Sequence, residues 1–198
     1  PGRADAIDLL QTAFRSGVEI LDTGDSYYAG PGGTAEAAVP HYVERVIAES
    51  LHGYKESPAK IRICTKGGMQ RVDSTSRGWR PRVCSRSVVG GLISASFEAL
   101  GGSRPIDIYM LHHTNTLSHQ QLEDALQVMH EAVKDGTVLS LGLANASLAD
   151  LQLAERLSIP VSVVQNQYSL WQREAEKPWH IGAARSCKKG VLDWCASR

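Results

Sequence analysis

Apolar and polar positions along the chain follow two spacings, a helical one and short continuous runs. Apolar residues at helical spacing predict five helices, at 4–16, 42–53, 84–100, 122–136 and 148–158. Short apolar runs predict six strands, at 18–22, 61–66, 106–111, 138–143, 161–166 and 191–195. A further helix is expected around 177–188. Helix and strand therefore alternate from one end of the chain to the other.

This alternation predicts an α/β fold with parallel strands joined by right-handed crossovers. A doubly wound open sheet and a (β/α)8 TIM-type barrel both satisfy it. No G-x-G-x-x-G follows the first strand, which counts against a dinucleotide-binding open sheet. In a barrel the carboxyl ends of the strands share one rim, where active sites are assembled. The barrel is favoured because polar residues end successive strands: Asp22, Lys66, His112, Asn145 and Gln165.

Composition and charge exclude several classes of function. The 198 residues suffice for one domain, 1–198, and the formal net charge is zero, with 21 basic and 21 acidic side chains. That balance gives no basis for binding nucleic acid or an anionic membrane surface. No apolar run approaches the roughly 18 residues of a membrane span. The four cysteines form no C-x-x-C pair and have no zinc-like spacing, so we expect no metal site and an intracellular, reducing compartment.

The polar residues at the strand ends gain meaning only as a set. Taken singly, Asp22 fits a turn cap, Lys66 a solvated side chain and His112 a structural histidine. Together with Tyr27 they form a coherent group for proton transfer. A phenol with an ordinary pKa near 10 becomes a better acid beside an ammonium, and a carboxylate keeps that ammonium charged. A hydride would have to come from a cofactor, because no side chain donates one.

Five motifs, in order along nearly the whole chain, resemble segments of the aldo-keto reductase superfamily. They are LDTGDSYY (21–28), CTKGG (64–68), IDIYMLHHTN (106–115), KDGTVLSLGLAN (134–145) and VVQNQYSL (163–170). Spacing within the first and third motifs selects Tyr27 over Tyr28 and His112 over His113. Each motif is weak alone, but five in order at the spacing of βα units are a strong signal.

This resemblance implies NAD(P)H-dependent reduction of an aldehyde or ketone, with NADP(H) as the expected cofactor. Tyr27 would donate the proton, Lys66 and Asp22 would assist it, and His112 would orient the carbonyl. The cofactor-binding residues implied are Thr23, Asn145, Gln165 and Trp194, the last stacking on the nicotinamide. The chain departs from the family pattern with Gly24 and Ala144, where alanine and serine are usual. Glu36 falls near the family's Ser-Glu, with its role left open.

The extent of the chain is shorter than the roughly 250 residues of a typical barrel. By the resemblance, the six predicted strands are strands two to seven. Strand one would precede Pro1, and strand eight, with the loop that grips the cofactor's phosphates, would follow Arg198. We therefore expect a partial barrel domain that belongs to a longer chain, or one whose gap is covered by a partner chain.

Two other functions remain open. A non-catalytic aldo-keto reductase-like subunit of a larger assembly would retain the fold without turnover, and a Schiff-base aldolase would use Lys66 as a nucleophile. The substrate is not predicted beyond a small carbonyl compound. Segment 70–82 carries Trp79 among four arginines; a solvated rim loop is expected there, with contact to an anionic ligand or a partner as the alternative.

Overall fold

The computed structural model describes residues 2–28, 34–54, 60–72, 78–82, 84–177, 180–181, 185–186 and 190–198. Five parallel strands form one sheet in the order β1-β2-β5-β6-β7. Each strand pairs with the next of these along the chain, as expected for successive βα units. Their bounds are β1 Ile20–Asp22, β2 Arg62–Gly67, β5 Ile106–Leu111, β6 Val138–Ala144 and β7 Val163–Gln165.

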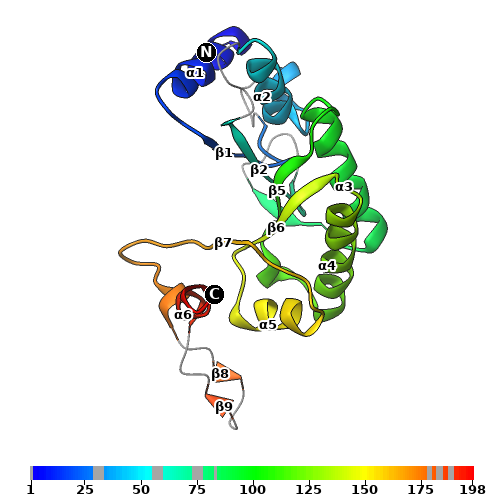
Figure 1. Ribbon diagram of the computed structural model, residues 1–198, viewed down its shortest axis with the longest axis vertical. Helices are drawn as coiled ribbons and strands as arrows, with labels where there is room; N and C mark the ends of the chain where they lie inside the picture. The colour runs from blue at the N-terminus through cyan, green and yellow to red at the C-terminus, as the bar shows by residue number, and fades with distance from the viewer. Residues whose placement is uncertain are drawn as a thin grey trace.

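The sheet curls, and helices follow its convex side (Figure 1). They are α1 Arg3–Arg15, α2 Tyr42–His52, α3 Arg86–Ala99, α4 His119–Lys134 and α5 Leu148–Arg156. Serine side chains start three of them by accepting a hydrogen bond from a backbone N–H of the first turn: Ser85, Ser118 and Ser147. Three short 3-10 helices, Glu36–Ala38, Thr114–Thr116 and Glu174–Glu176, lie in the connections. The fold is thus a half-barrel of the (β/α)8 type.

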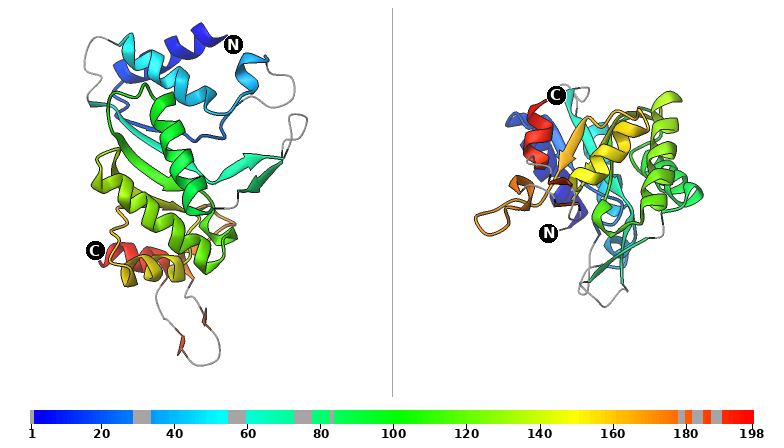
Figure 2. Two further views of the ribbon diagram at one scale, coloured as in Figure 1. Left: turned by 90° about the vertical axis from the view of Figure 1, so that its right-hand side faces the viewer. Right: turned by 90° about the horizontal axis from the view of Figure 1, so that it is seen from below.

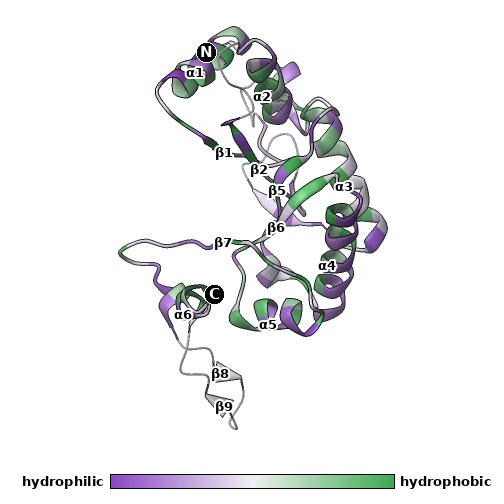
Figure 3. Ribbon diagram, viewed as in Figure 1, coloured by the Kyte–Doolittle hydropathy of each residue, from purple (hydrophilic) through white to green (hydrophobic). Residues whose placement is uncertain are grey.

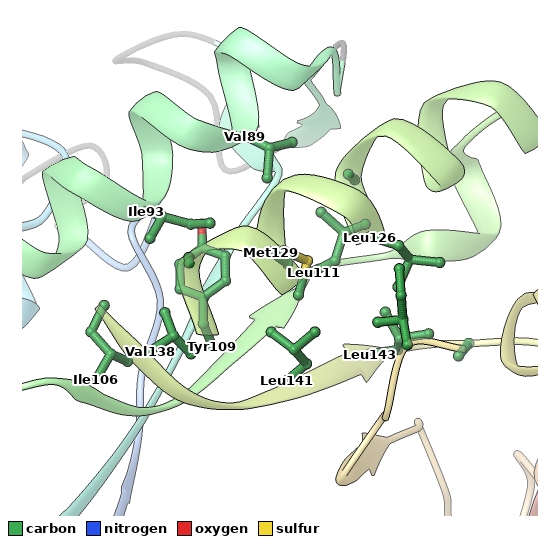
Figure 4. Packing of buried hydrophobic residues seen from close by; sticks show 14 of the residues in the cluster. Val89, Ile93, Ile106, Tyr109, Leu111, Leu126, Met129, Val138, Leu141 and Leu143 are labelled. Atoms are coloured by element: carbon green, nitrogen blue, oxygen red, sulfur yellow. The ribbon is translucent and has the colours of Figure 1, made fainter. Parts of the chain in front are cut away.

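The hydrophobic core lies between the convex face of the sheet and the helices. Val89 and Ile93 of α3 face Tyr109 of β5, and Met129 of α4 packs beside Leu111 (Figure 4). Strands β5 and β6 are buried along most of their length and are among the most hydrophobic ribbons of the molecule (Figure 3). Burial on both sides of a parallel strand explains why these strands are continuous apolar runs in the sequence.

Alternation along β2 separates two kinds of polar side chain. Thr65 is turned toward the helices, where its hydroxyl donates to Glu44 of α2 at 2.5 Å. Lys66 is turned toward the concave face, where it meets Asp22 at the end of β1. Because neighbouring residues of a strand point to opposite faces, one strand supplies polar groups to both sides of the sheet.

The helices and strands predicted up to β7 are all present, whereas the two elements predicted after β7 are wrong. The helix expected around 177–188 is wrong in its described part: β8 His180–Ile181 and β9 Arg185–Ser186 form an antiparallel pair there. Residues 178–179, 182–184 and 187–189 lie outside the described residues. The strand expected at 191–195 is also wrong, because those residues begin α6 Val191–Ala196.

The cause of the second error is local. The N–H of Gly190 donates to the Asp193 carboxylate at 2.9 Å, which satisfies a free donor of the first helical turn. This cap outweighs the strand preference of Val191 and Trp194. No helix within the described ranges is long and apolar enough to cross a membrane.

Candidate active site

Three of the predicted site residues meet at the carboxyl ends of neighbouring strands. Asp22 is the last residue of β1, Lys66 lies near the end of β2, and His112 directly follows β5. The Lys66 Nζ donates to Asp22 Oδ1 at 2.7 Å. The Lys66 side chain is 1% exposed, while that of Asp22 is 44% exposed. A cation this deeply buried needs its carboxylate partner, since unpaired burial of a charge is costly.

Tyr27 stands over this ion pair. Lys66 Nζ lies 5.1 Å from the centroid of the Tyr27 ring. The rings of Tyr27 and His112 have centroids 6.0 Å apart and are almost perpendicular. The segment that carries Tyr27 is fixed because the N–H groups of Thr23 and Asp25 donate to carbonyl oxygens of β2, at 2.8 and 2.9 Å. The structure therefore brings Asp22, Tyr27, Lys66 and His112 together.

Tyr28 and His113, the residues that the sequence spacing rejects, have different surroundings. Tyr28 packs against Arg71 and Trp79, with the Arg71 guanidinium 5.0 Å from its ring centroid. His113 has a positive φ of 56° and begins the turn after β5. Its ring lies 4.9 Å from that of His112. Of these two residues, only His113 has its ring next to the ring of a predicted site residue, His112.

His112 is held as a neutral imidazole. Its backbone N–H donates to the Gly67 carbonyl at 2.8 Å, which continues the β2–β5 pairing. The pKa of the ring is lowered to about 4, mainly by burial and also by the nearby His113 and Lys66, while Asp22 opposes this shift. The buried Nδ1 has no hydrogen-bond partner among the described residues. At neutral pH such a ring offers one N–H donor and one acceptor nitrogen.

Asn145 and Gln165 are neighbours at the ends of β6 and β7. The Asn145 N–H donates to the Gln165 carbonyl at 2.8 Å, and Asn145 has a positive φ of 53°. Its side-chain oxygen accepts from the N–H of Gln167 at 3.3 Å. The Gln165 side chain is exposed. A cavity of about 550 Å³ adjoins Asn145 and is lined by Asn115 and by residues after β6 and β7, without Tyr27 or His112.

Trp194 does not lie at a strand end. It is part of α6, and the Arg198 guanidinium lies 3.9 Å from the centroid of its ring. The indole Nε1 is buried without a partner in the described part of the chain. The prediction that placed Trp194 on a strand beside the cofactor is wrong in its structural basis, because the Gly190 cap turns this segment into a helix.

A buried polar cluster on the helix side of the sheet was missed by the sequence reasoning. Glu44 of α2 is fully buried; its Oε1 accepts from Thr65 Oγ1 at 2.5 Å, and its Oε2 lies 2.6 Å from His41 Nδ1. The backbone N–H of His41 in turn donates to the Asp25 carbonyl at 2.8 Å. Glu36, by contrast, is exposed and pairs with Arg3 at the surface.

Asp25 is the second buried carboxylate of this cluster. It is 0% exposed, and neither oxygen has a hydrogen-bond partner in the described residues. Its pKa is raised to about 6, mainly by burial; Arg82 and His41 oppose this shift, and Glu44 adds to it. The sequence contains one signal for this buried cluster, which is the position of Glu44. Glu44 lies three and seven residues before Ile47 and Leu51, so helical spacing places it on the buried face of α2.

Comparison with known proteins agrees with this fold. Residues 2–187 match the model of the aldo/keto reductase family. The chain is 27% identical over 181 residues to a probable aldo-keto reductase 1 of Glycine max, covering 87% of this chain and 44% of that protein. The protein belongs to the aldo/keto reductase family.

Solved structures show the same architecture. An aldo-keto reductase from Bacillus halodurans in its holo form superposes with a TM-score of 0.66 at 20% identity, covering 89% of this chain and 52% of that one. A glycerol dehydrogenase from Gluconobacter oxydans gives a TM-score of 0.67 at 19% identity, with 89% and 49% covered. The chain thus spans about half the length of these proteins.

Proposed function

We propose that the protein reduces an aldehyde or ketone to an alcohol, or catalyses the reverse reaction, with Tyr27 as the proton donor and NADP(H) as the cofactor. The observation that carries this proposal is the buried Lys66–Asp22 hydrogen bond, 2.7 Å long, beside the Tyr27 ring. An ion pair at that position has a chemical use, because it holds a positive charge where a phenolate would form.

Each residue of the site would contribute one step. Asp22 keeps the Lys66 ammonium charged and oriented. Lys66 stabilises the negative charge that develops on Tyr27 Oη as its proton moves to the carbonyl oxygen. The neutral His112, with its pKa lowered to about 4, donates a hydrogen bond to the same oxygen and orients the carbonyl. General acid catalysis of this kind contributes about 10²–10⁴-fold in rate.

The residues present fit the nicotinamide end of a dinucleotide. NADP(H), when bound, supplies the hydride. Asn145 and the exposed Gln165 would hold the carboxamide, because the two residues are hydrogen-bonded through their backbones at the ends of β6 and β7. The buried Thr23 hydroxyl also has no hydrogen-bond partner within the described residues, so it retains capacity for a ligand. The choice of NADP(H) over NAD(H) rests on the family resemblance.

Turnover of NADPH by the purified protein tests this function. We expect absorbance at 340 nm to fall when NADPH is mixed with a panel of aldehydes, with one alcohol formed for each NADPH consumed. The double variant Asp22→Asn/Lys66→Met is the matched negative control. The proposal is overturned if fluorescence titration detects no binding of NADPH and no aldehyde of the panel is reduced.

A role as a subunit of a larger assembly is a second candidate. Two neighbouring side chains after β7, Leu170 and Trp171, are 79% and 89% exposed. Side chains of this size at an open sheet edge are typical of a surface that another chain or segment covers. Light scattering supports this candidate if the protein is oligomeric and Trp171→Ser makes it monomeric.

The aldolase alternative is disfavoured by the same ion pair. A Schiff-base lysine must be neutral to attack a carbonyl, whereas the 2.7 Å contact with Asp22 stabilises the charged ammonium of Lys66. Borohydride treatment with an aldehyde checks this directly. A stable adduct at Lys66 would favour the aldolase over the reductase.

A further inference from the structure

A short hairpin that the sequence reasoning did not predict extends from the carboxyl end of β2. It consists of β3 Met69–Arg71 and β4 Trp79–Pro81, paired antiparallel so that Arg71 is opposite Trp79 (Figure 2). Its base is fixed because the Arg82 N–H donates to the Gly68 carbonyl at 2.8 Å. Lys66 is only three residues before β3, so the hairpin stands directly beside the proposed site.

Arg71 is held on the face of the hairpin that meets the two tyrosines. Its guanidinium lies 4.4 Å from the Trp79 ring centroid and 5.0 Å from that of Tyr28. One Nη donates to the Tyr28 carbonyl oxygen. Contacts with two aromatic rings and a carbonyl fix the plane of the group, and none of these three contacts neutralises its charge.

No carboxylate among the described residues pairs with Arg71. The ion pairs that the structure shows involve other arginines, and the buried Arg71 Nε has no hydrogen-bond partner in the described ranges. The hairpin's other described arginines are used differently. Arg80 alternates to the opposite face, level with Gln70, and the Nε of Arg82 donates to the Met69 carbonyl at 3.3 Å.

A row of aromatic rings connects Arg71 with the proton donor. The Trp79 ring lies 6.5 Å from the Tyr27 ring and 6.4 Å from the Tyr28 ring, centroid to centroid. Trp79 is therefore next to both the Arg71 guanidinium and the ring of Tyr27. A substrate that reached both would place a flat or extended body along Trp79 and a negative group at Arg71.

We propose that Arg71 anchors the carboxylate of a carbonyl substrate, so that the substrate class is aldehydes and ketones that also carry a carboxylate. The planar guanidinium matches a carboxylate with two parallel hydrogen bonds, which a point charge such as lysine does not. This inference rests on the proposed reductase function, which supplies the place of the carbonyl.

A matched pair of substrates tests the proposal. Reduction of 4-carboxybenzaldehyde is compared with that of its methyl ester, which has almost the same shape and no charge. We expect Arg71→Met to lower the ratio of kcat/KM for the acid over the ester by about 10- to 100-fold, the usual effect of a charge-assisted hydrogen bond. Arg71→Lys should recover part of the ratio, and Arg80→Met, on the other face, should leave the ratio as it is. An unchanged ratio in Arg71→Met overturns the proposal.

A binding measurement separates this proposal from the function on which it rests. Calorimetric titration with the product acid, 4-(hydroxymethyl)benzoate, is expected to show binding that weakens at least tenfold in Arg71→Met. If neither aldehyde is reduced but this binding depends on Arg71, the reductase function fails and the carboxylate site stands. If both aldehydes are reduced and neither ratio nor binding depends on Arg71, the carboxylate site fails alone. Absence of both binding and turnover overturns both.

Discussion

The two faces of the sheet, at the ends of β1 and β2, hold charged groups in opposite arrangements. On the concave face, the buried Lys66 is paired with the half-exposed Asp22 at 2.7 Å. On the helix face, Asp25 and Glu44 are both fully buried, and Glu44 adds to the burial that raises the pKa of Asp25. The Lys66–Asp22 pair places two opposite charges next to the proposed reaction. Asp25 and Glu44 bring two acidic groups together at a place where no reaction is proposed.

This difference indicates that the two faces have different roles around the loop that carries Tyr27. The backbone of Asp25 is tied to β2 through its N–H and to His41 through its carbonyl. The loop that ends in Tyr27 is therefore clamped from both faces. We infer that the concave pair acts on the chemistry of Tyr27, whereas the helix-side cluster sets where Tyr27 stands.

Removing the concave charge is expected to have the largest effect. Lys66→Met should lower kcat for aldehyde reduction by about 10³-fold, within the range of general acid catalysis, because no cation would then face the developing phenolate. The circular dichroism spectrum and the thermal midpoint should remain close to those of the unaltered protein. A variant that folds and retains more than a tenth of the activity contradicts the assignment of this pair to the chemistry.

Removing the helix-side acceptor is expected to affect stability. Glu44→Ala should lower the free energy of unfolding by about 3 kcal/mol, because the Thr65 hydroxyl and the His41 ring lose a fully buried partner. Urea denaturation measures this loss. Glu36→Ala is the matched control, since that exposed ion pair with Arg3 should contribute less than about 1 kcal/mol. Equal losses of unfolding free energy in the two variants would contradict the claim that the buried Glu44 contributes more to stability than the exposed Glu36.

Asp25 should make stability depend on pH. Its pKa is about 6 in the folded protein and about 3.9 when unfolded, so the folded state binds the extra proton. The contribution of Asp25 to stability should therefore be most favourable below about pH 4 and fall by about 2–3 kcal/mol as the pH rises through 6. Asp25→Asn, which mimics the protonated acid, should remove this contribution. An unfolding profile with the same slope in both proteins between pH 4 and 7 would contradict the raised pKa.

The smallest effect is expected from His112 at neutral pH. Because burial lowers its pKa to about 4, the ring stays neutral as the pH falls from 8 to 5.5. Carbon-13 NMR of labelled histidine should show a titration near pH 4 for the signal that His112→Asn removes. Stability should fall as the pH drops from about 6.5 to about 4, because the unfolded state then binds a proton that the folded state disfavours. A titration midpoint above 6 would be inconsistent with a neutral hydrogen-bond donor.

Much of the fold could be predicted because its signals are local. Five helices and the parallel strands up to β7 follow from apolar spacing that packing preserves. The end of the chain could not, because a single cap from Asp193 to Gly190 decides between strand and helix for residues rich in strand-forming side chains. The β3–β4 hairpin was missed since Gln70, Arg71 and Arg80 give it no apolar pattern.

The concave-face residues of the site could be predicted from local signals, whereas the helix-side cluster could not. Residues on the concave face, such as Asp22 and Lys66, follow apolar strands and are conspicuous as polar endings. Residues of the helix-side cluster depend on contacts between distant elements, as when Glu44 of α2 meets Thr65 of β2. Asp25 looked like an ordinary loop acid, and only its burial reveals otherwise.

A comparison of two neighbouring tyrosines tests most directly whether Tyr27 is the proton donor. Tyr27→Phe and Tyr28→Phe each remove one hydroxyl and keep the ring, so packing changes little in either. We expect Tyr27→Phe to lower kcat for a neutral aldehyde by at least about 100-fold while NADPH still binds. Tyr28→Phe should lower the same kcat by less than tenfold. Equal activity of the two variants, or a greater loss in Tyr28→Phe, would contradict Tyr27 as the proton donor.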